Sequence, residues 1–378
     1  MIKQFEVTGL NGFLDYKVKL HPDLNIFTGK NGSGKTTLLK LIWYMLSPNI
    51  ERTIPEILFS TANLETEEFQ LSITRKSVEK RERVYIKYTE QNKKIINVEV
   101  WADEFREPRS VVKVEEVNRR IVALPSGSLF FPTFRRIEGG FSLEQERRYH
   151  PTAYRMSDEL SEAISEYTNM MTVRKHKFIA SISTKDIEDL LTSQYADLSD
   201  RTNVLHSKLS NFISSSIGRQ PENIKGKKTS VKRELADARD LLEQIRGKVI
   251  EVKKSREELM KPFSALSKLI QKIFKDKGIR ITHNLTFGEA KDAIRSAILS
   301  AGEKQMLSFL CYNAFTNSSP IFIDEPELSL HIDWQRLLFP TLLSQGSKNQ
   351  FVVSTHSPFI YSKYPDKEFL LDKDRGDN

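Results

Sequence analysis

Eight consecutive residues near the amino terminus combine glycines, a lysine and a threonine in an order suited to binding phosphate. The run Gly29-Lys-Asn-Gly-Ser-Gly-Lys35-Thr36 follows the apolar stretch 24–28 and opens a helical stretch. Glycines let backbone N–H groups turn toward phosphate oxygens, and the helix amino end adds a favourable dipole. The Lys35 ammonium would reach the outer phosphates and the Thr36 hydroxyl would ligate Mg²⁺. The candidate phosphate-binding residues are Gly29, Asn31, Gly32, Ser33, Gly34, Lys35, Thr36 and Thr37.

Two adjacent carboxylates end a second apolar run. Residues 320–323 are uncharged and mostly apolar, and Asp324 and Glu325 follow them directly. Ligands bind at the carboxyl ends of parallel strands, so we expect both acids to lie near the phosphate loop. Asp324 suits the Mg²⁺ shell, and Glu325 can polarise an attacking water. Acids are common at strand ends, and it is the phosphate loop in the same chain that favours this interpretation.

Two further short segments contain candidate phosphate contacts. Ser300 and Gly302 stand at the start of an expected helix, where the serine, a backbone N–H and the helix dipole form a second anion site. Read alone, Ser300 could equally be an ordinary helix cap. His356 follows a second buried strand, 350–354, in the run Ser-Thr-His-Ser-Pro. A lone histidine in such a place is more often structural.

The order of these motifs resembles that of the heads of ABC and SMC ATPases. The resemblance implies ATP and Mg²⁺ as cofactors and a site shared by two copies of the chain. Ser300, Gly302 and Glu303 of one copy would bind the γ-phosphate held by the other. Three residues would be catalytic, and two would hold the metal. The catalytic residues are Lys35, Glu325 and His356; the metal ligands are Thr36 and Asp324.

One departure from that pattern concerns the metal. ABC heads usually carry a metal-binding glutamine after the strand that precedes the helical insertion. Here the strand 128–131 runs into Phe-Pro-Thr-Phe-Arg-Arg, and no glutamine follows before Gln145. The ligand from this half of the head therefore has no assignment.

Finer features resemble the SMC/RecF-like branch, and within it OLD-family proteins and standalone phage-defence ATPases such as AriA of PARIS and PtuA of Septu. The segments concerned are residues 131–136, 326–331, 333–335 and 354–358. OLD proteins also carry a Toprim nuclease domain, whereas 22 residues follow His356 here. The resemblance therefore leads us to expect that any nuclease is a separate effector polypeptide.

The predicted fold class is α/β: a P-loop NTPase of the ABC/SMC head type with a helical coiled-coil hairpin inserted. We expect an amino-terminal ATPase lobe (1–139), the insertion (140–275) and a carboxyl-terminal ATPase lobe (276–378). In the first lobe we expect one helix, 36–46, among strands. Two runs of apolar residues with heptad spacing predict the hairpin, and a compact helical bundle is the alternative. The runs are Leu191, Tyr195, Leu198, Thr202, Leu205, Leu209 and Phe212, then Leu235, Ala238, Leu242, Ile245, Val249, Val252, Arg256, Leu259, Phe263, Leu266, Ile270 and Ile273.

Charge is concentrated in the same region. Residues 201–278 carry 19 Lys and Arg against 9 Asp and Glu, a net charge of +10 in a chain whose total is +8. This segment could bind DNA, although solvated helix faces explain it equally well. No stretch is apolar enough to span a membrane, no signal peptide is recognisable, and the single Cys311 is expected in the core. We expect a cytoplasmic protein.

The leading functional hypothesis is an ATPase that dimerises on ATP and acts as the sensor or scaffold subunit of an antiphage defence system. It would control a separate effector, such as a nuclease. The alternative is a DNA-repair or DNA-tethering SMC/RecF-like ATPase that holds duplex with its basic arm. A transporter subunit fits less well, because about 135 residues of helices interrupt the head.

Overall fold

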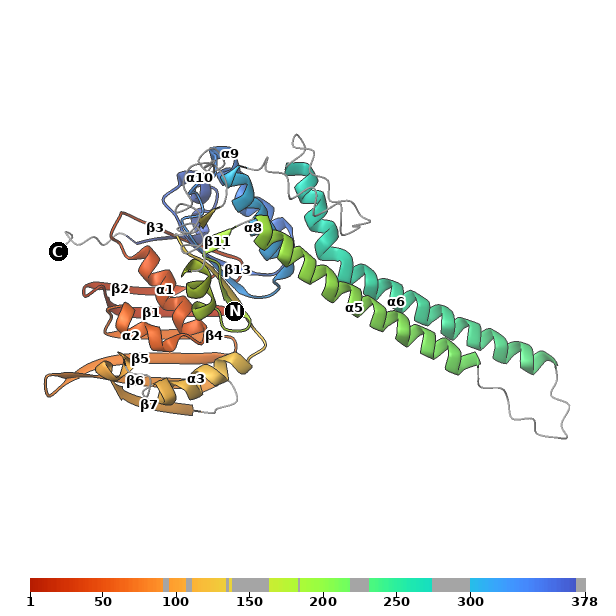
Figure 1. The fold of residues 1–378 in the computed structure, drawn as a ribbon, viewed down its shortest axis with the longest axis horizontal. Helices are drawn as coiled ribbons and strands as arrows, with labels where there is room; N and C mark the ends of the chain where they lie inside the picture. Colours follow the sequence, from red (N-terminus) through yellow and green to blue (C-terminus); the bar gives the residue numbers. More distant parts are fainter. Residues whose placement is uncertain are drawn as a thin grey trace, which may run out of the picture. The chain divides into compact units, whose positions relative to one another are not determined.

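The computed structural model describes residues 1–90, 95–106, 111–133, 136–137, 163–182, 184–217, 231–273 and 300–371. Figure 1 shows their arrangement as a ribbon. The chain divides into two compact units. The first comprises residues 1–186 and 296–378, and the second comprises residues 187–295.

A six-stranded parallel sheet forms the centre of the first unit. Its strand order is β10-β8-β12-β13-β3-β14, so strands from both ends of the chain alternate within it. Its inner strands are buried along their whole length, as expected for a sheet covered on both faces. The strands are β3 (Leu24–Thr28), β8 (Ser128–Phe131), β10 (His176–Phe178), β12 (Pro320–Asp324), β13 (Gln350–Ser354) and β14 (Glu368–Leu370).

An antiparallel sheet forms a second layer of this unit. Its strand order is β2-β1-β4-β5-β6-β7, and buried and exposed side chains alternate along most of its strands. One face therefore packs on the core while the other meets water. The strands are β1 (Ile2–Leu10), β2 (Leu14–Lys19), β4 (Thr61–Thr66), β5 (Phe69–Val78), β6 (Arg81–Glu90) and β7 (Ile95–Trp101).

Helix α1 (Lys35–Leu46) joins the two sheets. It contacts β8, β12 and β13 of the parallel sheet and β4 of the antiparallel one, and its last six residues are all buried. The Trp43 ring packs at a tilt against those of Phe130 and Phe178, at centroid distances of 5.3 and 5.6 Å. The carboxyl-terminal half of the helix is apolar on every side, which is typical of such a central position.

Shorter elements surround these layers. The amino-terminal half adds η1 (Ile50–Arg52), α2 (Thr53–Glu56), η2 (Ala102–Arg106) and α3 (Val111–Ala123), and residues 163–171 are helical. The carboxyl-terminal part adds α8 (Ala301–Phe315), α9 (Ile332–Ser344), α10 (Pro358–Tyr361) and η4 (Pro365–Lys367). Two short strands, β9 (Arg136–Ile137) and β11 (Ser181–Ile182), pair in parallel.

Two long helices make up most of the second unit: α5 (Thr184–Ile217) and α6 (Val231–Ile273). The rings of Tyr195 and Phe263 lie 6.4 Å apart, edge to face. This contact joins the beginning of α5 to the end of α6, as an antiparallel hairpin requires. The coiled coil itself stays a prediction. In the described part of the chain, no helix combines the length and apolar content needed to cross a bilayer.

The predicted heptad positions fit α5 better than α6. All seven positions on α5 are buried or half-buried. On α6 the predicted positions Leu242 and Val249 are 65% and 43% exposed, and Arg256 is exposed too. The less exposed stripe there includes Leu241 and Lys248 instead. Leu241 and Leu242 are both apolar, so spacing alone could not choose between them.

Most of the predicted head elements are confirmed, and the structure adds elements that were not predicted. The strands at residues 320–324 and 350–354 have the expected bounds, and Cys311 is buried. However, α3 and β4 were not expected, and the first lobe has more than one helix. β10 pairs with β8 in the head sheet, and the compact units divide at residue 186. The domain boundaries expected at residues 139–140 and 275–276 stay predictions. The sequence Ile-Arg-Ile-Thr-His-Asn-Leu at residues 279–285 also predicts a strand, and this segment lies outside the described residues.

The histidine of β10 gives a stability prediction. His176 is 3% exposed, its Nδ1 lies 2.9 Å from Ser128 Oγ, and burial lowers its pKa from 6.5 to about 4. The unfolded chain therefore binds more protons below pH 6.5, and the free energy of unfolding should fall as the pH drops from 6.5 to about 4. The slope should reach about 1.4 kcal/mol per pH unit. His176→Gln should flatten it in urea unfolding measured at several pH values, and equal slopes in both proteins would contradict the assignment.

Candidate functional site

Four loops meet at one edge of the parallel sheet. The strands β3, β8, β12 and β13 run in the same direction, so the loops that follow them emerge together. In register, Asp324 lies beside Ser354, and Ser354 lies beside Phe27. The phosphate loop, the acid pair and the histidine loop, which are far apart in the sequence, are thereby brought to one place.

The phosphate loop has the backbone shape that its glycines allow. Gly29 has a φ of 137°, and a Cβ there would stand 2.2 Å from the Leu371 carbonyl oxygen. The Lys35 ammonium donates to the carbonyls of Gly29 and Lys30 at 2.9 and 2.8 Å, so it points into the loop. The Tyr16 hydroxyl donates to the Ser33 carbonyl at 2.8 Å and holds the loop from β2. Only a glycine could occupy position 29 without displacing the backbone.

The carboxylate of Asp324 is the centre of the site. It is completely buried and accepts hydrogen bonds from three hydroxyl groups. Thr36 Oγ1 donates over 3.1 Å, and Ser354 and Thr133 also donate to it. Mg²⁺ prefers oxygen ligands and is commonly bound by one or two carboxylates together with substrate phosphates. The predicted ligands Thr36 and Asp324 are therefore together, and the oxygen-rich donor set fits Mg²⁺ bound with a nucleotide.

A metal held by protein side chains alone is a different case. The described residues contain no group of three or more His, Cys, Asp or Glu side chains able to hold one. A cation at Asp324 would thus depend on the phosphates for further ligands, which agrees with the phosphate loop beside it.

Glu325 lies next to the Asp324 centre in an unusual backbone conformation. Its φ is 47°, and its N–H donates to the Ser354 carbonyl at 2.9 Å. Burial raises the pKa of the Glu325 carboxyl, and the neighbouring Asp324 and Glu327 add to this, whereas His356 and Lys35 oppose it. A carboxylate with a raised pKa is better suited to accept a proton from water than an ordinary exposed glutamate.

Lys35 is electrostatically coupled to the same acids. Burial lowers the pKa of the Lys35 ammonium, and the carboxylates of Glu325, Asp324 and Glu327 oppose that effect. The structure therefore brings together the predicted Lys35, Asp324, Glu325 and His356. It also adds Glu327, which lies in the segment 326–331 and had no role assigned from the sequence.

The start of α8, at residue 300, packs against the loop that follows the acid pair. Ser300 caps α8: its Oγ accepts from the Glu303 N–H at 3.3 Å, while Glu303 accepts from the Ser300 N–H at 2.7 Å. A Cβ on Gly302 would stand 2.3 Å from the Ser329 carbonyl oxygen. Gly302 is thus required for the close packing of α8 against the loop after the acid pair. The binding of a second copy's phosphate by this segment stays a prediction.

Sequence reasoning assigned no role to three residues that contact parts of the site: Tyr16, Thr133 and Glu327. Thr133 takes the position after β8 where the expected glutamine is missing, and it reaches Asp324 through its hydroxyl. The sequence signals for Thr133 were its place after a buried strand that adjoins the site and its membership of the segment 131–136. Tyr16 and Glu327 contact the site through tertiary hydrogen bonds, and local sequence patterns do not reveal these bonds.

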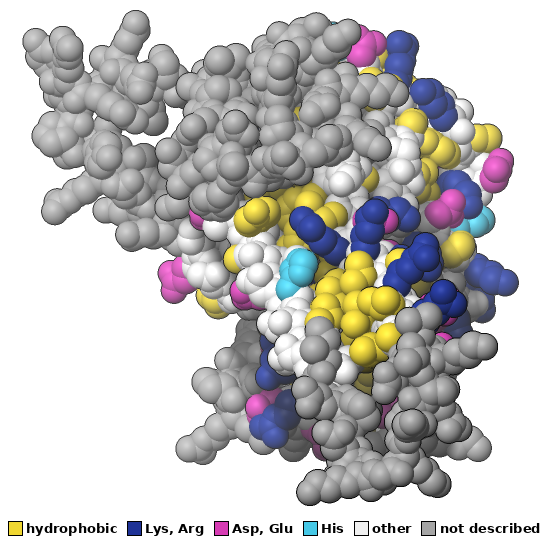
Figure 2. Space-filling model, turned by 90° about the vertical axis from the view of Figure 1, so that its right-hand side faces the viewer, with side chains coloured by type: hydrophobic (Ala, Val, Ile, Leu, Met, Phe, Trp, Pro, Cys, Tyr) yellow, Lys and Arg dark blue, Asp and Glu magenta, His cyan; other side chains and the backbone are white. Residues whose placement is uncertain are grey.

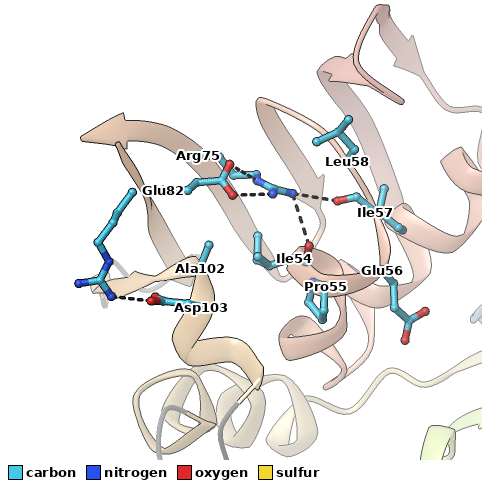
Figure 3. A pocket seen from close by; sticks show the side chains of 10 residues that line it. Ile54, Pro55, Glu56, Ile57, Leu58, Arg75, Glu82, Ala102 and Asp103 are labelled. Carbon is cyan, nitrogen blue, oxygen red and sulfur yellow. Dashed lines mark hydrogen bonds and ion pairs between the residues drawn. The ribbon is translucent and has the colours of Figure 1, made fainter. Parts of the chain in front are cut away.

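A cavity of about 600 Å³ lies beside the antiparallel sheet and contains none of the predicted site residues (Figure 3). Its main cation is already paired: Arg75 donates to both Glu82 oxygens at 2.7 Å and to the Ile57 carbonyl at 2.9 Å. Arg81 is paired with Asp103 at 2.5 Å. These bonds link β5 and β6 to neighbouring loops, so we interpret this region as structural.

The comparison with protein families decides the assignment. The family model for the AAA ATPase domain (AAA_15) matches residues 1–361. The chain belongs to this AAA ATPase family. Together with the α/β structure and the order of its motifs, this assigns the chain a P-loop ATPase fold of the ABC/SMC head type.

Individual relatives of this AAA ATPase are distant. The DNA replication and repair protein RecF of Lactococcus lactis subsp. cremoris, in strains MG1363 and SK11, is 38% identical over 52 residues. This match spans 14% of the chain and 14% of each RecF. Solved SMC heads from Pyrococcus furiosus and Pyrococcus yayanosii are 15% and 13% identical over 96% of the chain, covering 91% and 93% of theirs, each with a TM-score of 0.35.

The Thr133 contact leads to a prediction about the metal. Thr133→Val keeps the side-chain shape but removes a hydroxyl from the Asp324 carboxylate. We expect it to raise the Mg²⁺ concentration needed for half-maximal nucleotide binding by about tenfold. Thr133→Ser keeps the hydroxyl and is the matched control. Calorimetric titration of ATP at a series of Mg²⁺ concentrations measures the effect, and identical Mg²⁺ dependence in all three proteins would refute it.

Proposed function

We propose that this AAA ATPase hydrolyses ATP with Mg²⁺ at the edge of the parallel sheet, in a site that two copies of the chain complete. The observation that carries the proposal is the convergence of Lys35, Thr36, Asp324 and Glu325. A phosphate-binding ammonium, a metal-binding hydroxyl and carboxylate, and a carboxylate of raised pKa are the parts that phosphoryl transfer to water requires.

Each side chain has a separate task in this mechanism. Lys35 would neutralise the outer phosphates. Thr36 and Asp324 would hold Mg²⁺, which would offset the negative charge that develops during transfer. Glu325 orients the attacking water and accepts its proton. His356, which is exposed at the end of β13, contacts the γ-phosphate.

The second copy supplies the start of α8. Ser300 is exposed, and its hydroxyl accepts from Glu303 while keeping its own proton free to donate. The Gly302 N–H and the positive end of the helix dipole lie at the same end of α8, and both favour the binding of an anion there. ATP between two copies would therefore hold Lys35 of one against Ser300 of the other and close the dimer.

Glu325→Gln tests the hydrolytic step. The amide keeps the shape of the side chain but cannot take a proton, so ATP binding should persist while the hydrolysis rate falls by about 100-fold or more. The closed dimer should then accumulate with ATP. Phosphate release and light scattering with and without ATP measure the two effects, with Lys35→Ala as the control that fails to bind. Turnover at the normal rate in Glu325→Gln would refute the base assignment.

We further propose that the cycle of dimer closure serves a sensor or scaffold subunit of an antiphage defence system, with a separate effector, such as a nuclease, as partner. The support is the resemblance of the segments 326–331, 333–335 and 354–358 to the corresponding segments of standalone defence ATPases. Slow turnover suffices for such a switch, because each ATP only sets the state of the dimer.

DNA binding for repair or tethering is the second candidate, and the basic segment favours it. Lys253, Lys254 and Arg256 on α6 are exposed. Figure 2 shows Lys and Arg side chains lying among hydrophobic ones on one face of the molecule. Contacts of such side chains with phosphates would make binding to duplex DNA strongly dependent on salt.

Purification of the Glu325→Gln protein from its native host separates the two candidates. The closed state should retain a partner that the Lys35→Ala protein loses, and mass spectrometry with nucleic-acid analysis identifies it. A nuclease or other toxic enzyme that co-purifies only with Glu325→Gln supports the defence role. If duplex DNA co-purifies without a protein partner and added salt releases it, the DNA role is supported instead of the defence role.

A further inference from the structure

The carboxylate of Glu327 is bonded to the loop that carries His356. Glu327 Oε1 accepts from the His356 N–H at 2.7 Å, and Oε2 accepts from the Thr355 hydroxyl at 2.8 Å. Both oxygens thus hold two adjacent residues at the end of β13. Hydrogen bonds to an ionised carboxylate are about twice as strong as bonds between neutral groups.

The segment that carries Glu327 is itself anchored from the opposite side. The buried Gln305 of α8 donates to the Pro326 carbonyl at 2.9 Å, and Gly302 packs directly on the Ser329 carbonyl. These contacts with α8 fix the position of the loop after the acid pair, so the Glu327 side chain extends from an anchored backbone. A mobile loop could not position another one.

A second connection runs parallel to the first. The Ser357 hydroxyl donates to Gln335 Oε1 at 2.5 Å, and Gln335 Nε2 donates to the Leu330 carbonyl at 2.8 Å. Gln335 holds the histidine loop at residue 357, and Glu327 holds it at residues 355 and 356. Of these two side chains, Glu327 is the one that bonds the backbone of His356.

We propose that Glu327 is a positioning residue for hydrolysis: its carboxylate fixes the backbone of His356 so that the imidazole meets the γ-phosphate of the nucleotide held by the same chain. The inference rests on the proposed function and adds a role for a residue that has no part in the mechanism as described above. His356 is exposed on a loop, so its direction depends on how its backbone is held. Misplacement of a reacting group by about 1 Å can cost about 100-fold in rate.

Glu327→Ala and Glu327→Gln form a matched pair. Alanine removes both bonds, whereas the amide oxygen of glutamine can still accept from the His356 N–H and its NH₂ can donate to the Thr355 hydroxyl. We expect alanine to lower kcat by about 10- to 100-fold with a KM for ATP changed by less than about threefold, and glutamine to restore most of kcat. Equal losses in both variants, or no loss in either, would overturn the positioning role.

A mixed dimer separates positioning from general destabilisation. Lys35→Ala on one chain and Ser300→Arg on the other leave one competent site, formed by the phosphate loop and His356 of the Ser300→Arg chain. Glu327→Ala should lower turnover when it is added to that chain and not when it is added to the Lys35→Ala chain. A loss of equal size in both placements would show a structural role and refute the proposal.

The mixed dimer without any change at Glu327 tests the shared ATP site separately from the positioning role of Glu327. Turnover by this dimer, with none by either mutant alone, is the result that the shared site requires. If the unmodified mixed dimer is inactive while the wild-type protein hydrolyses ATP, the shared site fails, and the comparison of Glu327→Ala with Glu327→Gln still decides the positioning role. If the wild-type protein does not hydrolyse ATP, both proposals are wrong.

Discussion

The head is organised around one buried carboxylate. Asp324 is fully removed from water, and a carboxylate in that state is tolerated only when hydrogen bonds or a cation compensate for lost hydration. The compensating hydroxyls come from three other places in the chain: Thr36 at the start of α1, Thr133 after β8 and Ser354 at the end of β13. None of them is near Asp324 in the sequence. The site therefore exists only once the parallel sheet has formed.

The same constraint explains why the two ends of the chain share one sheet. The parallel order places β3 beside β13, so the phosphate loop and the histidine loop become neighbours. The buried side-chain amide of Gln350 links the two ends of the chain. It accepts a hydrogen bond from the Ile2 N–H and donates one to the Ile2 carbonyl, both at 2.8 Å, across 348 positions of sequence. These bonds also connect the parallel sheet to the antiparallel one. Helices can be inserted between the two halves because nothing in this arrangement requires them to be contiguous.

Sequence reasoning succeeded where the chemistry is local. The phosphate loop and the acid pair are each contained in a few residues, and the buried strands 320–324 and 350–354 are short, uncharged for most of their length and clearly bounded. It failed where the signal is weak or depends on the fold. β10 is three residues long and includes a lysine and a histidine, so its membership in the head sheet was not visible. β4 buries only Ala62, Leu64 and Thr66, which gives a faint alternation.

The helix α3 was missed for a different reason. Its buried positions Val114, Val117 and Ile121 have helical spacing, so the pattern was present but was not recognised among the strands around it. On α6 the pattern was ambiguous, because apolar residues occupy two adjacent stripes of the helix. Which stripe turns inward is decided by packing against a partner helix, and that information is not local.

The loop between residues 325 and 330 shows how a strained backbone serves the site. Consecutive side chains of a strand point to opposite faces, so an extended chain would direct Asp324 and Glu325 away from each other. Glu325 instead has a φ of 47°, and its N–H still bonds the Ser354 carbonyl. Asp324 can thus face the hydroxyls while Glu325 stays within the field of Lys35 and His356. Such a conformation in a residue other than glycine costs about 1 to 3 kcal/mol and persists when its surroundings over-determine it. Here the bonds of Gln305 to Pro326 and of Glu327 to the histidine loop supply that support, so the turn that separates the two carboxylates is held from both sides.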